Sequence, residues 1–229
     1  MRKATKYTLI GIGSLAAFVV GAALLVVFLP EKPSSIDHQG SFDVYHFHNS
    51  RLGEPGYSRQ ELWYHGKRLA EYPTDASLHP EQDRILFVNA RDAPSGAPDP
   101  KGNGIYYFDA RSEKQYELTR GKYPSFSNGE RNWPGGSTPN PNTIPWSRDG
   151  SFAVVSYRDH LQPPDWTFRT ESVLFVDLAT GAVQNAADLL GVSELEHITF
   201  RGWSEDGSLM FFGVGDDERT LPATAVAKR

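Results

Sequence analysis

The chain has 229 residues, enough for one domain with a sizeable core behind an apolar N-terminal segment. Residues 31–229 hold 20 Lys and Arg, because three of the 23 in the chain precede them, against 28 Asp and Glu, so their formal charge is −8. This charge argues against nucleic acid or an anionic lipid surface as the main partner. The absence of cysteine excludes disulfides and thiolate chemistry, so packing alone must stabilise the fold.

Residues 7–29 form an apolar run of 23 residues without a formal charge. At a rise of about 1.5 Å per residue, a helix of this length crosses a hydrocarbon core of roughly 30 Å. Arg2, Lys3 and Lys6 precede the run, and their positive charge favours a cytoplasmic N-terminus. We therefore expect a single-pass protein of the cell (inner) membrane, with a cytoplasmic tail at 1–6, a transmembrane helix at 7–29, a polar linker at 30–40 and a periplasmic or extracellular domain at 41–229.

The same apolar run allows two further interpretations. A cleaved signal peptide also begins with basic residues, but its apolar core usually has about 7 to 15 residues and ends at small residues, whereas this run ends in Val-Val-Phe-Leu-Pro. Within it, Gly13, Ala17 and Gly21 recur at every fourth position, a row of small residues that lets two membrane helices approach closely. A homodimer through this row is one hypothesis, beside the simpler reading that Gly and Ala are common in membrane helices.

From residue 41 onward the sequence is typical of an all-β fold. Short aromatic and β-branched runs alternate with clusters of Gly, Pro, Asn and Asp, and a short helix is expected only within 186–195. Three segments share one design, in which a short strand and a polar turn precede a longer apolar strand: 77–88, 145–156 and 202–213. The recurring Asp-Gly pairs and serines predict tight hairpin turns, and Trp146 and Trp203 are expected to fill the space between neighbouring layers.

A second strand pair follows two of these segments, at 104–116 and 172–184, and its turn begins with Asp in both. Leu78 and Trp146 lie 68 positions apart, and so do Asp109 and Asp177. Both halves therefore repeat in register, which predicts one duplicated four-stranded unit.

The Trp-Ser-x-Asp-Gly strand, followed by a strand ending in Asp-x-x-Thr-Gly, resembles the blade repeat of TolB-like and dipeptidyl-peptidase-type β-propellers. The resemblance covers about residues 77–213 and is best at 144–184. It implies a binding platform, or a gating domain attached to a peptidase. With a partial unit at 198–227 and a diverged one at 42–72, we expect a small or incomplete β-propeller of about four blade-like units, preceded by one transmembrane helix. Either its terminal strands share a blade, or the ring stays open and another chain covers its edges.

Two loops are the predicted contact surface, a long Pro- and Gly-rich one and, as a weaker candidate, a shorter one. The loop at 120–142 carries residue types enriched at binding hot spots, and the loop at 158–166 ends in a tryptophan. The predicted binding residues are Tyr123, Phe126, Arg131, Trp133 and Trp166. The alternative is that these are ordinary surface loops without a binding role.

The sequence contains no nucleophile elbow, zinc-protease motif or phosphate-binding loop, so we predict no catalytic residue, no metal ligand and no cofactor. His46 and His48 share a face of a predicted strand, but a metal site generally needs a third ligand. We expect a membrane-anchored, non-enzymatic binding or scaffold module for another envelope protein. The alternative is a hydrolase, or the accessory domain of an enzyme that processes peptides or glycans.

Overall fold

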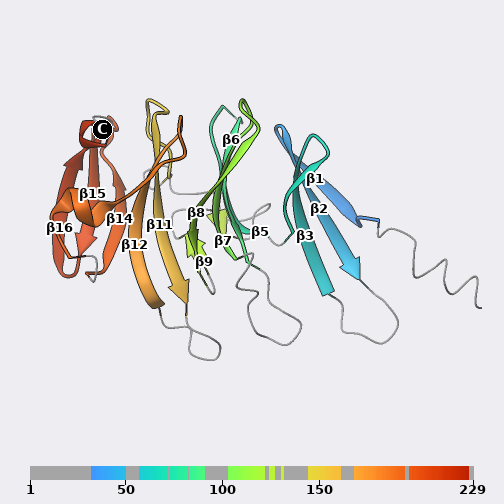
Figure 1. The fold of residues 1–229 in the computed structure, drawn as a ribbon, viewed down its shortest axis with the longest axis horizontal. Helices are drawn as coiled ribbons and strands as arrows, with labels where there is room; N and C mark the ends of the chain where they lie inside the picture. Colours follow the sequence, from blue (N-terminus) through green and yellow to red (C-terminus); the bar gives the residue numbers. More distant parts are fainter. Residues whose placement is uncertain are drawn as a thin grey trace, which may run out of the picture.

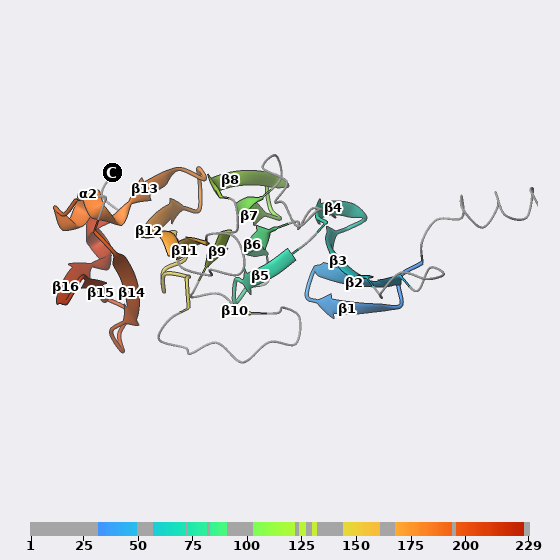
Figure 2. The same cartoon turned by 90° about the horizontal axis from the view of Figure 1, so that it is seen from below.

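The computed structural model of the chain describes residues 32–49, 57–71, 73–81, 83–90, 103–121, 124–126, 130–131, 144–160, 168–193 and 196–226. In this part the chain is almost entirely β, and its strands form four antiparallel sheets. The sheets follow one another in chain order and stand side by side in a row (Figures 1 and 2). The expected all-β fold is therefore confirmed.

The first two sheets are up-and-down meanders. The first contains β1 (Ser35–Gln39), β2 (Phe42–Asn49), β3 (Tyr57–Tyr64) and β4 (Lys67–Ala70), paired in chain order. The second contains β5 (Pro73–Leu78), β6 (Arg84–Asn89), β7 (Gly104–Asp109) and β8 (Lys114–Arg120), also in chain order, with β10 (Glu130–Arg131) added beside β5.

The last two sheets repeat this plan. The third contains β9 (Pro124–Phe126), β11 (Phe152–His160), β12 (Phe168–Asp177) and β13 (Val183–Asn185), and the short helix α2 (Ala186–Leu190) follows it. The fourth contains β14 (Ile198–Trp203), β15 (Leu209–Val214) and β16 (Asp217–Pro222), followed by the 3₁₀ turn η2 (Ala223–Ala225). Helix α2 lies within the range predicted for a short helix, where Asn185 caps its first turn and Gly191 ends it.

The duplication predicted from the sequence is present in register. Strands β6 and β11 begin at Arg84 and Phe152, and strands β7 and β12 end at Asp109 and Asp177. Each pair of positions is 68 residues apart, as the sequence repeat requires. Asp177 also begins its turn as expected, because its Oδ1 accepts hydrogen bonds from the backbone of the turn.

The arrangement is propeller-like but open within the described residues. The first and the fourth sheets lie at opposite ends of the row, and no described strand of the N-terminal region joins the fourth sheet (Figure 1). Of the two alternatives considered from the sequence, a blade shared by the two ends of the chain is therefore not found among these strands.

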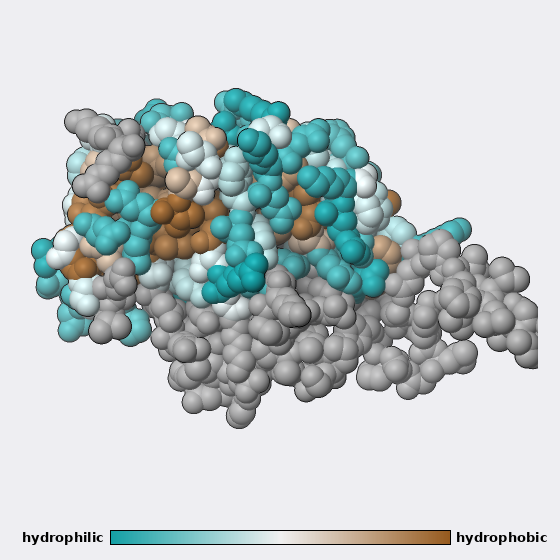
Figure 3. All heavy atoms as spheres, viewed as in Figure 1, coloured by the Kyte–Doolittle hydropathy of each residue, from teal (hydrophilic) through white to brown (hydrophobic). Residues whose placement is uncertain are grey.

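Both faces of the inner sheets are buried, and this explains their nearly continuous apolar runs. On β6, Ile85 and Phe87 pack toward the first sheet, whereas Leu86 and Val88 pack toward the third. On β11, Phe152 and Val154 face the fourth sheet in the same alternating way. Apolar side chains accordingly gather between neighbouring sheets. On the face shown in Figure 3, polar side chains cover much of the surface, and apolar patches are visible between them.

Two expectations about connecting segments were wrong in detail. The linker expected at 30–40 contains β1, which pairs with β2. Because β1 is an edge strand with no buried face, its sequence does not alternate between apolar and polar residues. The insertion at 120–142 contributes β9 to the third sheet and β10 to the second. Backbone pairing, which leaves little trace in composition, forms both short strands.

No helix in the described part of the chain is long and apolar enough to cross a membrane. The predicted tail, transmembrane helix and small-residue row of Gly13, Ala17 and Gly21 all lie outside the described residues. Membrane anchoring therefore stays a prediction of the sequence.

Candidate functional site

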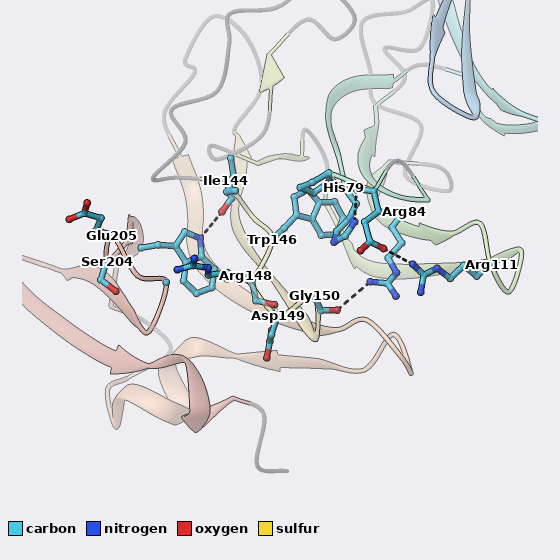
Figure 4. Close-up of a pocket in the computed structure, with 15 residues that line it drawn as sticks. His79, Arg84, Arg111, Ile144, Trp146, Arg148, Asp149, Gly150, Ser204 and Glu205 are labelled. Atoms are coloured by element: carbon cyan, nitrogen blue, oxygen red, sulfur yellow. Dashed lines mark hydrogen bonds and ion pairs between the residues drawn. The ribbon is translucent and has the colours of Figure 1, made fainter.

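A cleft of about 630 Å³ lies where the hairpin turns of the second, third and fourth sheets meet. Its volume is within the range usual for ligand sites, roughly 300 to 1,000 Å³. Trp146 and Trp203 line it together with three arginines, Arg84, Arg111 and Arg148. Figure 4 shows the residues of the second sheet on one side, Ile144 to Gly150 of the third sheet in the middle, and Ser204 and Glu205 of the fourth sheet on the other.

The same turn builds the middle and the far side of the cleft. The backbone N–H of Phe152 donates to Ser147 Oγ at 3.1 Å, and that of Leu209 donates to Ser204 Oγ at 2.9 Å. Gly150 and Gly207 occupy the left-handed region, with φ of 67° and 72°, as the predicted tight turn requires. The expected serine and glycine roles are thus confirmed.

An aspartate fixes each of these turns. Asp149 Oδ1 accepts hydrogen bonds from the Ser147 hydroxyl at 2.9 Å and from the Ser151 backbone at 3.1 Å. Asp206 accepts the corresponding bond from the Ser204 hydroxyl at 2.6 Å. That hydrogen bond is the largest cause that lowers the pKa of Asp206 to about 2, so its carboxylate is ionised at neutral pH.

Two tryptophans and two arginines join neighbouring sheets. The indole N–H of Trp146 donates to Ser77 Oγ in the second sheet at 3.0 Å, and that of Trp203 donates to the carbonyl of Ile144 beside the third sheet at 2.8 Å. In the opposite direction, Arg84 Nη1 donates to the Gly150 carbonyl at 3.2 Å, and Arg148 Nη1 donates to the Asp206 carbonyl at 2.8 Å.

These bonds place the two tryptophans in equivalent surroundings, with each indole bonded to the preceding sheet. Trp146 is 3% exposed, whereas Trp203 is half-buried at the edge of the interface between the third and fourth sheets. The prediction that both fill the space between layers is confirmed.

His79, Glu81 and Asp83 bring one ligand atom each to within 4.8 Å of one another, a grouping that could hold a metal ion. Arg111, however, makes ion pairs with both carboxylates. The Nδ1 atom of His79 accepts a hydrogen bond from the Glu81 backbone N–H at 3.2 Å, which uses the lone pair that a metal would need. The cluster therefore fits an arginine ion-pair network better than a metal centre.

His79 is buried against the edge of Trp146, with ring centroids 5.0 Å apart. Burial lowers the pKa of His79 below its usual value, although the Asp83 carboxylate acts in the opposite direction. The imidazole is consequently neutral at pH 7 and serves as a packed wall of the cleft.

The residues predicted for binding lie elsewhere in the sequence. Phe126 is in β9 and Arg131 in β10, but only their backbone belongs to the described structure. Tyr123, Trp133 and Trp166 lie outside the described residues. The loop surface therefore stays a prediction.

His46 and His48 are both on β2, as expected. His46 Nε2 lies 2.8 Å from Asp37 Oδ2, and its Nδ1 lies 3.3 Å from the Gln60 amide, so both ring nitrogens have partners. This pairing explains His46 as part of the first sheet.

A buried carboxylate in the first sheet was not anticipated. Glu61 is 3% exposed, and it accepts a hydrogen bond from Trp63 Nε1 at 2.9 Å. Arg59 and Arg68 each approach Glu61 Oε1 at 3.1 Å. The charge of Glu61 is balanced within the sheet, which is the arrangement of a structural ion-pair network.

The cleft arginines were also missed. Arg148 and Glu205 occupy the variable position of the Trp-Ser-x-Asp-Gly repeat, so the repeat already marked their turns. That these turns face one another follows only from the stacking of the sheets.

Comparison with known proteins defines no family for the chain, because neither a family model nor a curated protein matches it. Among solved structures it is similar to the tricorn protease, with 9% identity over 81% of the chain and a TM-score of 0.40, and it spans 15% of that protein's length. It is also similar to the β-propeller domain of the trilobed protease from Pyrococcus furiosus, with 10% identity over 87% of the chain and 73% of that domain and a TM-score of 0.26. A third similar structure is TolB from Acinetobacter baumannii, with 14% identity over 80% of the chain and 52% of that protein and a TM-score of 0.21.

Proposed function

We propose that this chain is a membrane-anchored binding module that presents the cleft to a partner protein of the cell envelope. The observation that carries the proposal is the cleft itself, which lies across the turns of three sheets and is lined by Trp146, Trp203 and three arginines. Tryptophan and arginine are the residue types most enriched at the energetic centres of protein interfaces. A rigid sheet scaffold that presents such groups on its turns suits recognition.

The hydroxyl groups of the cleft support binding over hydrolysis. The hydroxyls of Ser147 and Ser204 donate to the aspartates of their own turns and accept from the backbone. A serine nucleophile needs a general base that can take its proton, and the aspartates bonded to these serines, whose pKa values are lowered, are too weak as bases for that role. The same reasoning accounts for their recurrence at equivalent positions of the repeat.

Two features of the sequence belong to the same proposal. Residues 7–29 would anchor the chain in the bilayer with the sheets outside the cytoplasm, and a homodimer through the small-residue row remains a hypothesis. The loop at 120–142, with its aromatic residues, is proposed as a second contact surface of the same module.

Photocrosslinking in intact cells tests the proposal. A photoreactive residue replaces Glu205, which is exposed and lines the cleft, or Trp133 of the predicted loop. The matched control carries the same residue at Thr220, an exposed position of β16. We expect a discrete adduct with one envelope protein from Glu205 and Trp133, and none from Thr220.

The outcome against the proposal is equally specific. If Glu205 and Thr220 give the same adducts, or if neither gives a discrete adduct at any stage of growth, the cleft is not a docking surface and the binding-module proposal fails.

A further inference from the structure

The positive charges of the cleft are not equally neutralised. Arg111 is paired with Glu81 and Asp83. Arg148, which is exposed, has only a backbone carbonyl as hydrogen-bond partner among the described residues, and no carboxylate of that part of the chain lies within ion-pair distance of it. Arg148 therefore offers an unpaired guanidinium to the cleft.

Arg84 is only partly neutralised. Its Nη1 donates to the carbonyl of Gly150, and its buried Nε has no hydrogen-bond partner in the described structure. Its one ion pair in the described structure is a long one, with Oδ1 of Asp109 at 4.0 Å from Nε, a distance too great for a hydrogen bond. A half-buried guanidinium with only one distant carboxylate partner gains from an additional anionic ligand.

The acidic residues that line the cleft make no ion pair with either arginine in the described part of the chain. Asp149 is held inside its own turn by Ser147 and Ser151, and Glu81 is paired with Arg111. Burial acts to raise the pKa of Asp149, but the hydrogen bonds from Ser151 and Ser147 together outweigh it and lower the pKa. Glu205 remains as an exposed acid at the far side of the cleft.

The rest of the lining adds apolar surface beside the arginines. Ile144 and the half-buried Trp203, whose indole N–H donates to the Ile144 carbonyl, line the same cleft as Arg148. A ligand that follows the turns from one sheet to the next meets charge and apolar surface in succession. An extended peptide with acidic and apolar side chains has this chemistry.

We propose that the cleft binds an acidic segment of a partner polypeptide, with its carboxylates on Arg84 and Arg148 and an apolar side chain against Trp203. This inference rests on the proposed binding function and names its ligand class. The formal charge of −8 on residues 31–229 disfavours longer polyanions, so a local positive cleft in a negative domain selects a short acidic peptide over a nucleic acid.

Fluorescence anisotropy with the full chain in detergent micelles tests the ligand class. The probes are a short labelled peptide of alternating Glu and Leu, its counterpart with Gln in place of Glu, and a labelled single-stranded oligonucleotide. We expect the acidic peptide to bind about tenfold more tightly than the amide peptide, the ratio that corresponds to about 1.4 kcal/mol, and to weaken as salt is added. The oligonucleotide should bind more weakly than the acidic peptide.

Three variants separate ligand binding from folding. Arg148→Gln should abolish most of the preference for the acidic peptide, whereas Arg219→Gln, which removes the same charge on β16 outside the cleft, should leave it unchanged. Glu205→Gln should strengthen binding of the acidic peptide by roughly twofold to threefold, because it removes a like charge. A damaged fold cannot give this gain of affinity.

Several results would overturn the inference: equal affinity for the acidic and amide peptides, equal effects of Arg148→Gln and Arg219→Gln, weaker binding by Glu205→Gln, or tighter binding of the oligonucleotide. If any of these occurs while Glu205 still crosslinks to one envelope protein, the ligand class is wrong and the binding module stands. If the crosslink is also absent, both proposals fail.

Discussion

Replacing Trp146 by alanine measures how strongly the interface between the second and third sheets holds the fold. The side chain is 3% exposed and belongs to the apolar layer of β6, β7, β11 and β12. Its indole N–H also bonds Ser77 Oγ at 3.0 Å. The substitution therefore removes both packing and a buried hydrogen bond.

The magnitude follows from these contacts. A buried tryptophan removes about 200 Å² from water, which at about 25 cal/mol per Å² gives about 5 kcal/mol as an upper value. Substitutions of buried aromatic residues by alanine cost about 3–5 kcal/mol in practice, and we expect Trp146→Ala to lie in that range. Trp146→Phe keeps most of the packing and loses the hydrogen bond, so about 1–2 kcal/mol is expected.

Urea unfolding of the full chain, followed by far-ultraviolet circular dichroism, gives the free energies of unfolding. Trp203→Ala is the matched comparison, because Trp203 is the equivalent residue of the next interface but is only half-buried. Its loss should be about half that of Trp146→Ala, or about 2 kcal/mol. A loss below about 1 kcal/mol for Trp146→Ala, or a larger loss for Trp203→Ala, would refute the reasoning.

Two further predictions concern the turns. Gly181 and Gly150 both have a left-handed φ, 73° and 67° respectively. A Cβ added at Gly181 would lie 2.1 Å from the Tyr116 ring, whereas a Cβ added at Gly150 would lie no nearer than 3.8 Å to any neighbouring atom. Gly181→Ala should therefore lose about 1–3 kcal/mol more than Gly150→Ala in urea unfolding, and equal losses would argue against the clash. Asp206, whose folded pKa of about 2 lies below its ordinary 3.8, contributes stability that is present above pH 3.8 and lost as the pH falls toward 2. Near neutral pH, the urea midpoint of Asp206→Ala should therefore be lower than that of the unmodified chain. The two midpoints should converge as the pH falls from 3.8 toward 2. A difference between the midpoints that does not change with pH would contradict the assignment.

Much of the fold could be predicted because the repeat recurs in register. The Asp-Gly turns fix the hairpins, and the serines before them bond the backbone as their residue type suggests. Strand β1 was missed because an exposed edge strand carries no apolar alternation, and β9 and β10 were missed because each is held by a few backbone bonds within a Pro- and Gly-rich stretch. Local residue patterns contain no information about such pairings.

The cleft depended on information that the linear sequence does not hold. Arg84, Arg111 and Arg148 come from three different turns, and their convergence is set by how the second and third sheets stack. His79 looked uninformative by itself, and its role follows from contact with Trp146. The residues predicted for binding were chosen by type within the long loops, and their side chains lie outside the described structure.

The central claim is that the turns of neighbouring sheets lie directly against one another and so form the cleft. A Cβ added at Gly207 would lie 3.2 Å from the Cβ of Arg148, close to the spacing of about 3.8 Å found in disulfides. Because the chain has no cysteine, the double variant Arg148→Cys/Gly207→Cys should form a single intrachain disulfide on oxidation, detected by mass spectrometry, and the pair Arg148→Cys/Thr220→Cys should not. Free thiols, or bonds only between molecules, in the first variant would contradict the stacked arrangement on which the cleft depends.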